Sequence, residues 1–187
     1  MKKDESNFKN QFLIAMPGLE DSNFDHAVTL MCEHSGEGAI GLVINRPTDL
    51  KLSEMLAQMG LEHDALPADI SVFWGGPVAP ERGFVIHRAP GGWESCLQLQ
   101  RDLYITTSRD ILKAIGKGEG PKDYFVVLGY AGWGEGQLET EILGNSWLSA
   151  PASGQILFHT PARDRWKEAT RLLGVDVTQL SNDVGHA

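Results

Sequence analysis

Cys32 and His34 are separated by one residue, a spacing that could serve nucleophilic chemistry. The thiolate is the reactive form of cysteine, and a neighbouring imidazolium lowers the pKa of a thiol. If a β-strand continues through the pair, both side chains lie on one face of a sheet, because side chains alternate along a strand. The two residues could then act as nucleophile and base in a hydrolytic or redox enzyme. A buried strand cysteine beside a turn histidine is the commoner arrangement.

The same two side chains could also bind a metal ion, because thiolate and imidazole are ligands of zinc. A zinc site needs three or four protein ligands, so the others would have to come from His26, His87 or Cys96. No spacing in the sequence requires these residues to meet. We therefore expect no metal and no cofactor.

A glycine-rich stretch at residues 129–136 follows an apolar run and precedes a segment with helical spacing. We expect a close-packed corner between a strand and a helix. The dinucleotide-binding fingerprint is not met, because Gln137 or Glu139 stands where its last glycine is required, and the Walker pattern is absent. Glu135, Glu139 and Glu141 would repel a phosphate, although they suit the positive end of a helix. The stretch therefore does not predict a nucleotide site.

Other polar and aromatic residues stand beside glycine or proline, where they could wall a binding site. Arg46 and Arg82 lie at the ends of expected strands and could bind a carboxylate or a phosphate. Each could equally pair with an acidic residue such as Glu33, Glu135 or Asp25 to fix a loop. We expect a site for an unknown small molecule or protein partner, formed by Asn45, Arg46, Gly75, Gly76, Arg82, His87, Tyr130, Trp133 and Gln137.

Composition narrows the classes of partner. The 187 residues are 42% hydrophobic, which suits one domain over residues 1–187 with a loose N-terminal segment at residues 1–10. Sixteen basic against 25 acidic residues give a net charge of −9, which disfavours direct nucleic-acid binding and an anionic membrane surface. Two cysteines do not indicate a disulfide scaffold, and no apolar run is long enough for a signal peptide or membrane span. We expect a soluble cytoplasmic protein.

Hydrophobic periodicity predicts about eight or nine strands and four helices in mixed order. The expected strands cover residues 12–15, 28–32, 39–44, 70–74, 83–87, 97–100, 103–106 and 124–128, and residues 147–150 and 156–158 could each form a further short strand. The expected helices cover residues 53–59, 107–115, 136–143 and 161–173, with a short tail at residues 175–187 that could form one further turn. Consecutive strands early in the chain favour antiparallel pairing, so the fold class is α+β, with mixed α and β elements.

Several segments together resemble the signature segments of the YqgE/AlgH family. They are residues 12–17 (FLIAMP), 32–34 (CEH), 41–47 (GLVINRP), 75–78 (GGPV), 82–87 (RGFVIH), 129–139 (GYAGWGEGQLE), 141–142 (EI), 145–147 (NSW) and 185–187 (GHA). The resemblance runs in order from about residue 10 to the end of the chain. It implies a bifurcated mixed sheet curled into a pseudo-barrel, with helices packed outside. It implies no catalytic residues, since the family is uncharacterised and some members merely carry the label of transcriptional regulator.

These observations favour a binding or regulatory protein that is not an enzyme and that acts through a small effector or a protein partner. The alternative is a hydrolase or redox enzyme that uses Cys32 and His34. Direct DNA regulation ranks third because of the acidic charge balance.

Overall fold

The computed structural model describes residues 7–19 and 21–176, so residues 1–6 and the expected tail turn beyond residue 176 lie outside the described part. The strands are β1 (Gln11–Ala15), β2 (Val28–Ser35), β3 (Gly38–Val43), β4 (Pro47–Lys51), β5 (Ser71–Trp74), β6 (Val78–His87), β7 (Cys96–Gln100), β8 (Leu103–Thr106), β9 (Tyr124–Trp133) and β10 (Trp147–Pro151). The helices are α1 (Leu52–Gln58), α2 (Arg109–Gly116), α3 (Gln137–Leu143), α4 (Gly154–His159) and α5 (Arg165–Arg171), with a 3₁₀ turn η1 (Ala162–Asp164) before α5.

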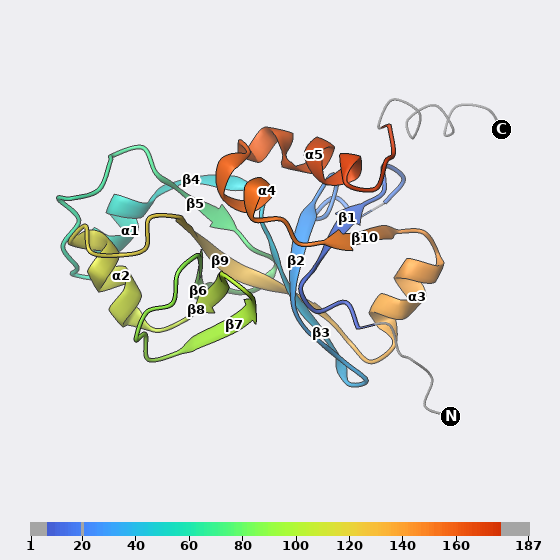
Figure 1. Ribbon diagram of the computed structural model, residues 1–187, viewed down its shortest axis with the longest axis horizontal. Coiled ribbons are helices and arrows are strands. Elements are labelled where there is room, and N and C mark those ends of the chain that lie inside the picture. Colours follow the sequence, from blue (N-terminus) through green and yellow to red (C-terminus); the bar gives the residue numbers. More distant parts are fainter. Residues whose placement is uncertain (1–6, 20, 177–187) are drawn as a thin grey trace.

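Strand β9 is the element on which the sheet divides. Its first half pairs with β6 in antiparallel and with β5 in parallel orientation, whereas its second half pairs with β3. The strand order is β10-β1-β2-β3-β9-β6-β8-β7, with β5 joining β9 and β4 joining β5. In Figure 1, β9 crosses the centre of the molecule between the part that carries α1 and α2 and the part that carries β1, β10 and α3. The expected bifurcated mixed sheet is confirmed.

The sheet curls into a half-barrel, and three apolar clusters account for its stability. The central cluster lies inside the curl and is closed by α4 and α5, which contribute Ile156, Leu157 and Trp166. A second cluster packs beneath α3, and a third packs beneath α1 and α2. Neighbouring residues of one strand serve different clusters, such as Leu30 and Met31 of β2, because side chains alternate between the faces.

Two of the expected boundaries are wrong in ways that affect the site. The glycine-rich stretch is not a corner, since β9 continues as a strand through Trp133 and only the residues after it turn into α3. Likewise β2 does not end at Cys32 but continues to Ser35. Glycines weaken strand propensity, but pairing with β3 supplies the hydrogen bonds that keep this part of β9 extended.

Three further expectations need correction. Residues 156–158 form part of helix α4 instead of a strand, because the Ser153 hydroxyl accepts a hydrogen bond from the Ile156 N–H at 3.3 Å and caps the helix. Strand β4 was not expected; it begins at Pro47, and a proline is tolerated as the first residue of a strand at a sheet edge. The described residues contain five α-helices, one more than expected, and the segment expected as one helix over residues 161–173 is η1 followed by α5. Within residues 7–19 and 21–176, none of the helices has the length and apolar character needed to cross a membrane.

Candidate functional site

Asn45 and Arg46 hold the loop that precedes β2. The Asn45 side chain donates to the His26 carbonyl and accepts from the Val28 N–H, both at 2.9 Å. The Arg46 guanidinium donates to backbone carbonyls of the same loop, including that of Asp25 at 2.7 Å, and lies over a tryptophan ring. Arg46 therefore fixes a loop, but through backbone carbonyls instead of a carboxylate.

Gly75 and Gly76 allow the chain between β5 and β6 to lie directly against β9. A Cβ on Gly75 would meet the Gly129 carbonyl oxygen at 2.3 Å, and one on Gly76 would meet the Tyr130 carbonyl carbon at 2.0 Å. No side chain larger than hydrogen fits between these backbones. The space beside both glycines is filled by the chain itself, so neither glycine presents an open backbone surface to a ligand.

His87 is fully buried between β6 and β8. Its ring stacks on Tyr104, with centroids 5.6 Å apart, and its Nδ1 lies 3.2 Å from the Arg88 carbonyl. Because a carbonyl only accepts, Nδ1 carries the proton, and the Thr106 hydroxyl donates to Nε2 at 2.8 Å. Burial lowers the pKa of His87, which favours the neutral ring. The residue stabilises the sheet and does not reach the surface.

Trp133 and Gln137 belong to a polar cluster that joins β9, α3 and β10. The Glu141 carboxylate accepts hydrogen bonds from the indole N–H of Trp133 at 2.6 Å and from that of Trp147 at 3.3 Å. Gln137 accepts from the Gly134 N–H and donates to Glu141. These polar groups satisfy one another, and the cluster fixes α3 on the sheet.

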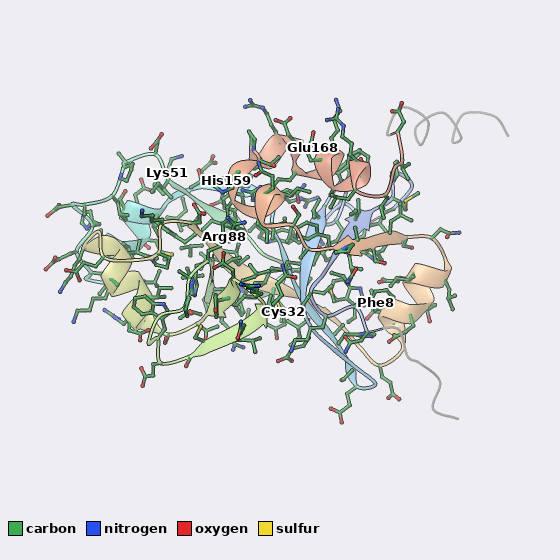
Figure 2. The ribbon with its side chains drawn as sticks, viewed as in Figure 1. Phe8, Cys32, Lys51, Arg88, His159 and Glu168 are labelled. Carbon is green, nitrogen blue, oxygen red and sulfur yellow. The ribbon has the colours of Figure 1, made fainter. Side chains whose placement is uncertain are left out.

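Cys32 and His34 lie on opposite faces of the sheet, contrary to the expectation from their spacing. A β-bulge shifts the pairing of β2 with β3 between Met31 and Glu33, so the alternation of side chains changes there. Cys32 belongs to the central cluster, whereas the His34 ring contacts Phe8 on the side covered by α3. In Figure 2, Cys32 lies near the middle of the molecule and Phe8 lies beside α3.

Neither residue is prepared for nucleophilic catalysis. Burial raises the pKa of the Cys32 thiol to about 12, and the thiol donates to the Leu30 carbonyl. His34 accepts from the Phe8 N–H through Nδ1 at 3.1 Å, so its proton is on Nε2 and points at Glu139. Both imidazole nitrogens are engaged. The geometry therefore argues against a catalytic pair in which Cys32 is the nucleophile and His34 is its base.

Arg82 and Tyr130 do come together, at a cavity of about 330 Å³ that also reaches Cys32. The buried part of the lining is apolar and consists of Cys32, Phe84 and Ile105. The rim is polar or half-exposed and consists of Glu33, Ile40, Arg82, Ser95, Cys96, Leu97, Thr107 and Tyr130. We name this cavity the Arg82 groove.

Arg82 supplies the positive charge of the groove. Its guanidinium lies over the Phe84 ring, 5.3 Å from the centroid, and the residue is exposed. Within residues 7–19 and 21–176, no carboxylate forms an ion pair with Arg82. The stacking on Phe84 orients the guanidinium while leaving its N–H groups available.

A shallower hollow of about 800 Å³ adjoins the Arg82 groove, because Glu33, Ile40 and Tyr130 line both. Trp133 lines this second hollow, so it lies near Tyr130 as expected. Two exposed apolar side chains flank the combined surface, Leu97 at 38% and Val78 at 39% exposure. Sequence reasoning missed Cys96, Leu97 and Ser95, because the segment that carries them reaches Arg82 only through the β7–β8–β6 pairing.

The nine expected site residues thus occupy several places. Arg82, Tyr130 and Trp133 line the two adjoining hollows, Asn45 and Arg46 face another side of the molecule, and the rest are buried or engaged with their neighbours. Among the residues that the structure describes, no three His, Cys, Asp or Glu side chains are grouped so that they could hold a metal ion.

Comparisons with known proteins agree with the fold. The sequence model of a family described as AlgH-like matches residues 12–178. A UPF0301 protein of Thioalkalivibrio sulfidiphilus is 57% identical over 182 residues, which cover 97% of this chain and 98% of that protein. A UPF0301 protein of Methylococcus capsulatus is 49% identical over 187 residues and covers both chains completely.

Two solved structures share the architecture. The solution structure of the AlgH protein from Pseudomonas aeruginosa is 44% identical, covers both chains completely and has a TM-score of 0.78. The crystal structure of protein DIP2367 from Corynebacterium diphtheriae is 22% identical, covers 91% of this chain and 89% of that one, and has a TM-score of 0.70. The second likeness concerns the fold alone.

Proposed function

This chain belongs to the AlgH-like family, and we propose that it is a non-enzymatic binding protein whose ligand is an apolar organic anion held in the Arg82 groove. The observation that carries the proposal is an exposed arginine without an acidic partner among the described residues, fixed at the rim of a cavity with an apolar floor. The anion would pair with Arg82, and its hydrocarbon part would cover Phe84 and Ile105.

The chemistry of the groove supports an anion over a neutral or cationic ligand. Arginine binds carboxylates and phosphates through paired N–H groups, and the pairing strengthens where an apolar wall displaces water. The side chains of Ser95, Thr107 and Tyr130 at the rim offer hydroxyl groups that could orient the ligand. Glu33 at the same rim disfavours a second negative charge, so a monoanion fits best.

We assign the protein a regulatory role in the cytoplasm, in which a protein partner responds to occupancy of the groove. Strand β7 supports this role, because within the described chain it pairs only with β8 and carries the exposed groove residues Cys96 and Leu97. A ligand in the groove would change the surface along this free edge. The net charge of −9 argues for a protein partner instead of DNA.

Matched ligands test the proposal by thermal melting. The probes are 2-naphthoate and octanoate, each compared with its neutral amide and with a primary ammonium compound of the same apolar part. A ligand at about 100 times its dissociation constant adds roughly 2.7 kcal/mol to the free energy of unfolding. For a chain of this size, that raises the melting midpoint by about 5–10 °C.

Arg82→Gln and Arg101→Gln are the matched variants, since Arg101 is an exposed arginine in the turn between β7 and β8 and does not line the groove. We expect the carboxylates to raise the midpoint of the unchanged protein and of Arg101→Gln, but not that of Arg82→Gln. Equal shifts with the amides, or shifts that persist in Arg82→Gln, would refute an anion site at this groove.

A further inference from the structure

A third hollow, of about 450 Å³, lies on the side of the molecule that α3 covers. It is lined by Phe8, Gly36, Glu135, Gly136, Glu139, Ile142 and Leu143. Leu143 is 84% exposed, the largest value among the exposed large apolar side chains of the described residues. Leu143 adjoins the partly buried Phe8 and Ile142 in this lining, and apolar side chains gathered around a hollow favour a surface that another molecule covers. We name it the α3 hollow.

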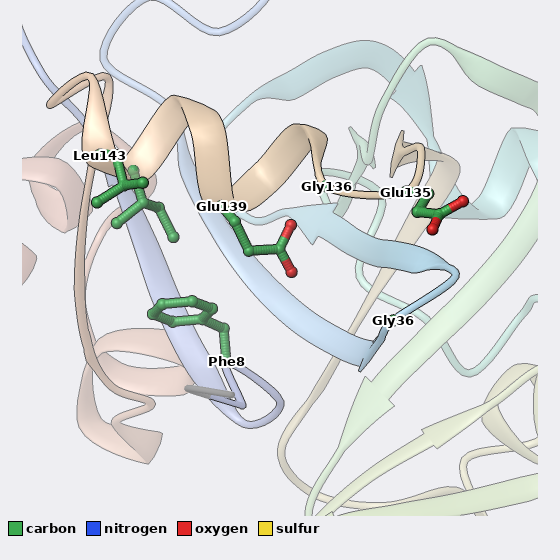
Figure 3. Close-up of a pocket in the computed structure, with 7 residues that line it drawn as sticks. Phe8, Gly36, Glu135, Gly136, Glu139 and Leu143 are labelled. Carbon is green, nitrogen blue, oxygen red and sulfur yellow. The ribbon is translucent and has the colours of Figure 1, made fainter. Parts of the chain in front are cut away.

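The lining of the α3 hollow is divided into an apolar end and an acidic end. Figure 3 shows Phe8 and Leu143 facing each other at one end, Glu135 at the other, and Glu139 pointing into the space between them. Ile142 adds to the apolar lining. An occupant would therefore need apolar and cationic groups side by side.

Both carboxylates are available to a cation. The hydrogen bond from His34 lowers the pKa of Glu139 and keeps it ionised, and this bond uses only Oε1. Glu135 is exposed and forms no ion pair with any residue in the described ranges. The net charge of −9 also attracts a positively charged partner to this protein.

The walls of the hollow are fixed before anything binds. The Phe8 N–H donates to His34, which holds the N-terminal segment against β2, and the His34–Glu139 pair holds α3 to the same strand. Glu141, on α3, accepts from the indole groups of Trp133 and Trp147. A surface that needs no rearrangement loses little conformational entropy on binding.

We propose that the α3 hollow docks a segment of a partner protein in which an apolar side chain is followed by lysine or arginine. The apolar side chain packs between Phe8 and Leu143, and the cation meets Glu135 and Glu139. A macromolecular partner fits better than a small amine, because Leu143 and Glu135 are exposed and a small ligand would leave much of its own surface in water. The proposal does not depend on the Arg82 groove.

Short capped peptides of three kinds test this interface. The probe acetyl-Leu-Phe-Lys-Arg-amide is compared with acetyl-Leu-Phe-Glu-Glu-amide and acetyl-Ser-Ser-Lys-Arg-amide. Backbone amide shifts of the ¹⁵N-labelled protein report both the affinity and the place of binding. We expect only the first peptide to shift the amide signals of Phe8, Glu139 and Leu143.

Single substitutions measure the apolar part and the ionic part of the contact separately. We expect Leu143→Ala to weaken binding about 5- to 30-fold and Glu135→Gln about 2- to 5-fold, as fits an exposed leucine and an exposed ion pair. Leu172→Ala is the control, because Leu172 is 49% exposed and does not line the hollow. It should leave the affinity unchanged.

Three results would overturn the proposal. The first is equal binding of the acidic peptide, which would remove the role of the carboxylates. The second is amide shifts that map away from α3. The third is a concentration-dependent dimer in analytical ultracentrifugation that Leu143→Ala abolishes, because a second copy of the chain would then be the occupant.

Discussion

The Nε2 atom of His34 lies 2.6 Å from Oε1 of Glu139, across 105 positions of sequence. This hydrogen bond joins the end of β2 to the first turn of α3. Because His34 also accepts the Phe8 N–H, one imidazole connects three segments of the chain. The pair therefore helps to set the walls of the α3 hollow.

Glu139→Gln should remove the acid sensitivity that the Glu139 carboxylate gives to the stability of the protein. The hydrogen bond from His34 lowers the pKa of Glu139 below its ordinary value of 4.5, so the folded state favours the carboxylate. The resulting stabilisation is complete above pH 4.5 and is lost as the pH falls through the lowered pKa. Since Glu139 is half-exposed, we expect the variant to lose less than about 1 kcal/mol at pH 6.

Urea unfolding at pH 6 and at pH 3 checks this prediction. The stability difference between the unchanged protein and Glu139→Gln should be smaller at pH 3 than at pH 6. Glu135→Gln is the control for the loss of one negative charge, because Glu135 does not bond to His34. A difference that stays constant between the two pH values would contradict the assignment.

Glu141→Leu should be strongly destabilising, because it removes the acceptor shared by two buried indole groups. Trp133 and Trp147 would each keep an N–H without a partner, at a cost of about 1–3 kcal/mol for each group. We expect a total loss of about 2–5 kcal/mol in urea unfolding. Glu141→Gln keeps an acceptor oxygen and should lose less; if both variants match the unchanged protein, the carboxylate does not hold the indoles.

Gly76→Ala tests whether this glycine serves the fold or a ligand. A Cβ there would meet the backbone of Tyr130 at 2.0 Å, and the φ of +154° is one that side chains rarely adopt. We expect a loss of more than about 3 kcal/mol or a failure to fold. Gly36→Ala is the control, since a Cβ at Gly36 meets no atom within 4 Å. A stable, folded Gly76→Ala would mean that the space beside β9 is open.

The sequence predicted much of the fold because apolar runs and their breaks are local signals. Residues 12–15 and 103–106 are strands as expected, and the helix expected at residues 53–59 forms with a shift of one residue. Residues 156–158 were misassigned because three apolar residues are too few to distinguish a strand from a helix. The N-cap at Ser153 favours the helix that forms there. The strand that begins at Pro47 was missed because proline more often ends a strand.

The candidate site was harder to predict, because it depends on contacts between distant segments. Arg82 and Tyr130 line one cavity, whereas Arg46 and His87 form hydrogen bonds within the fold. The β-bulge in β2 places His34 and Cys32 on opposite faces of the sheet, and no pattern in the sequence predicts this bulge.

Thiol titration with a disulfide reagent at pH 8 should separate the two cysteines. Cys96 is exposed at the rim of the Arg82 groove, and we expect it to react at the rate of a free thiol within a factor of about ten. Cys32 is buried, and its thiol has a pKa raised to about 12, so almost none of it is thiolate at that pH. In Cys96→Ala the fast phase should disappear and Cys32 should react only on unfolding in urea, whereas Cys32→Ala should keep the fast phase. If Cys32 reacts rapidly in folded Cys96→Ala, Cys32 could act as a nucleophile, contrary to what its position in β2 indicates.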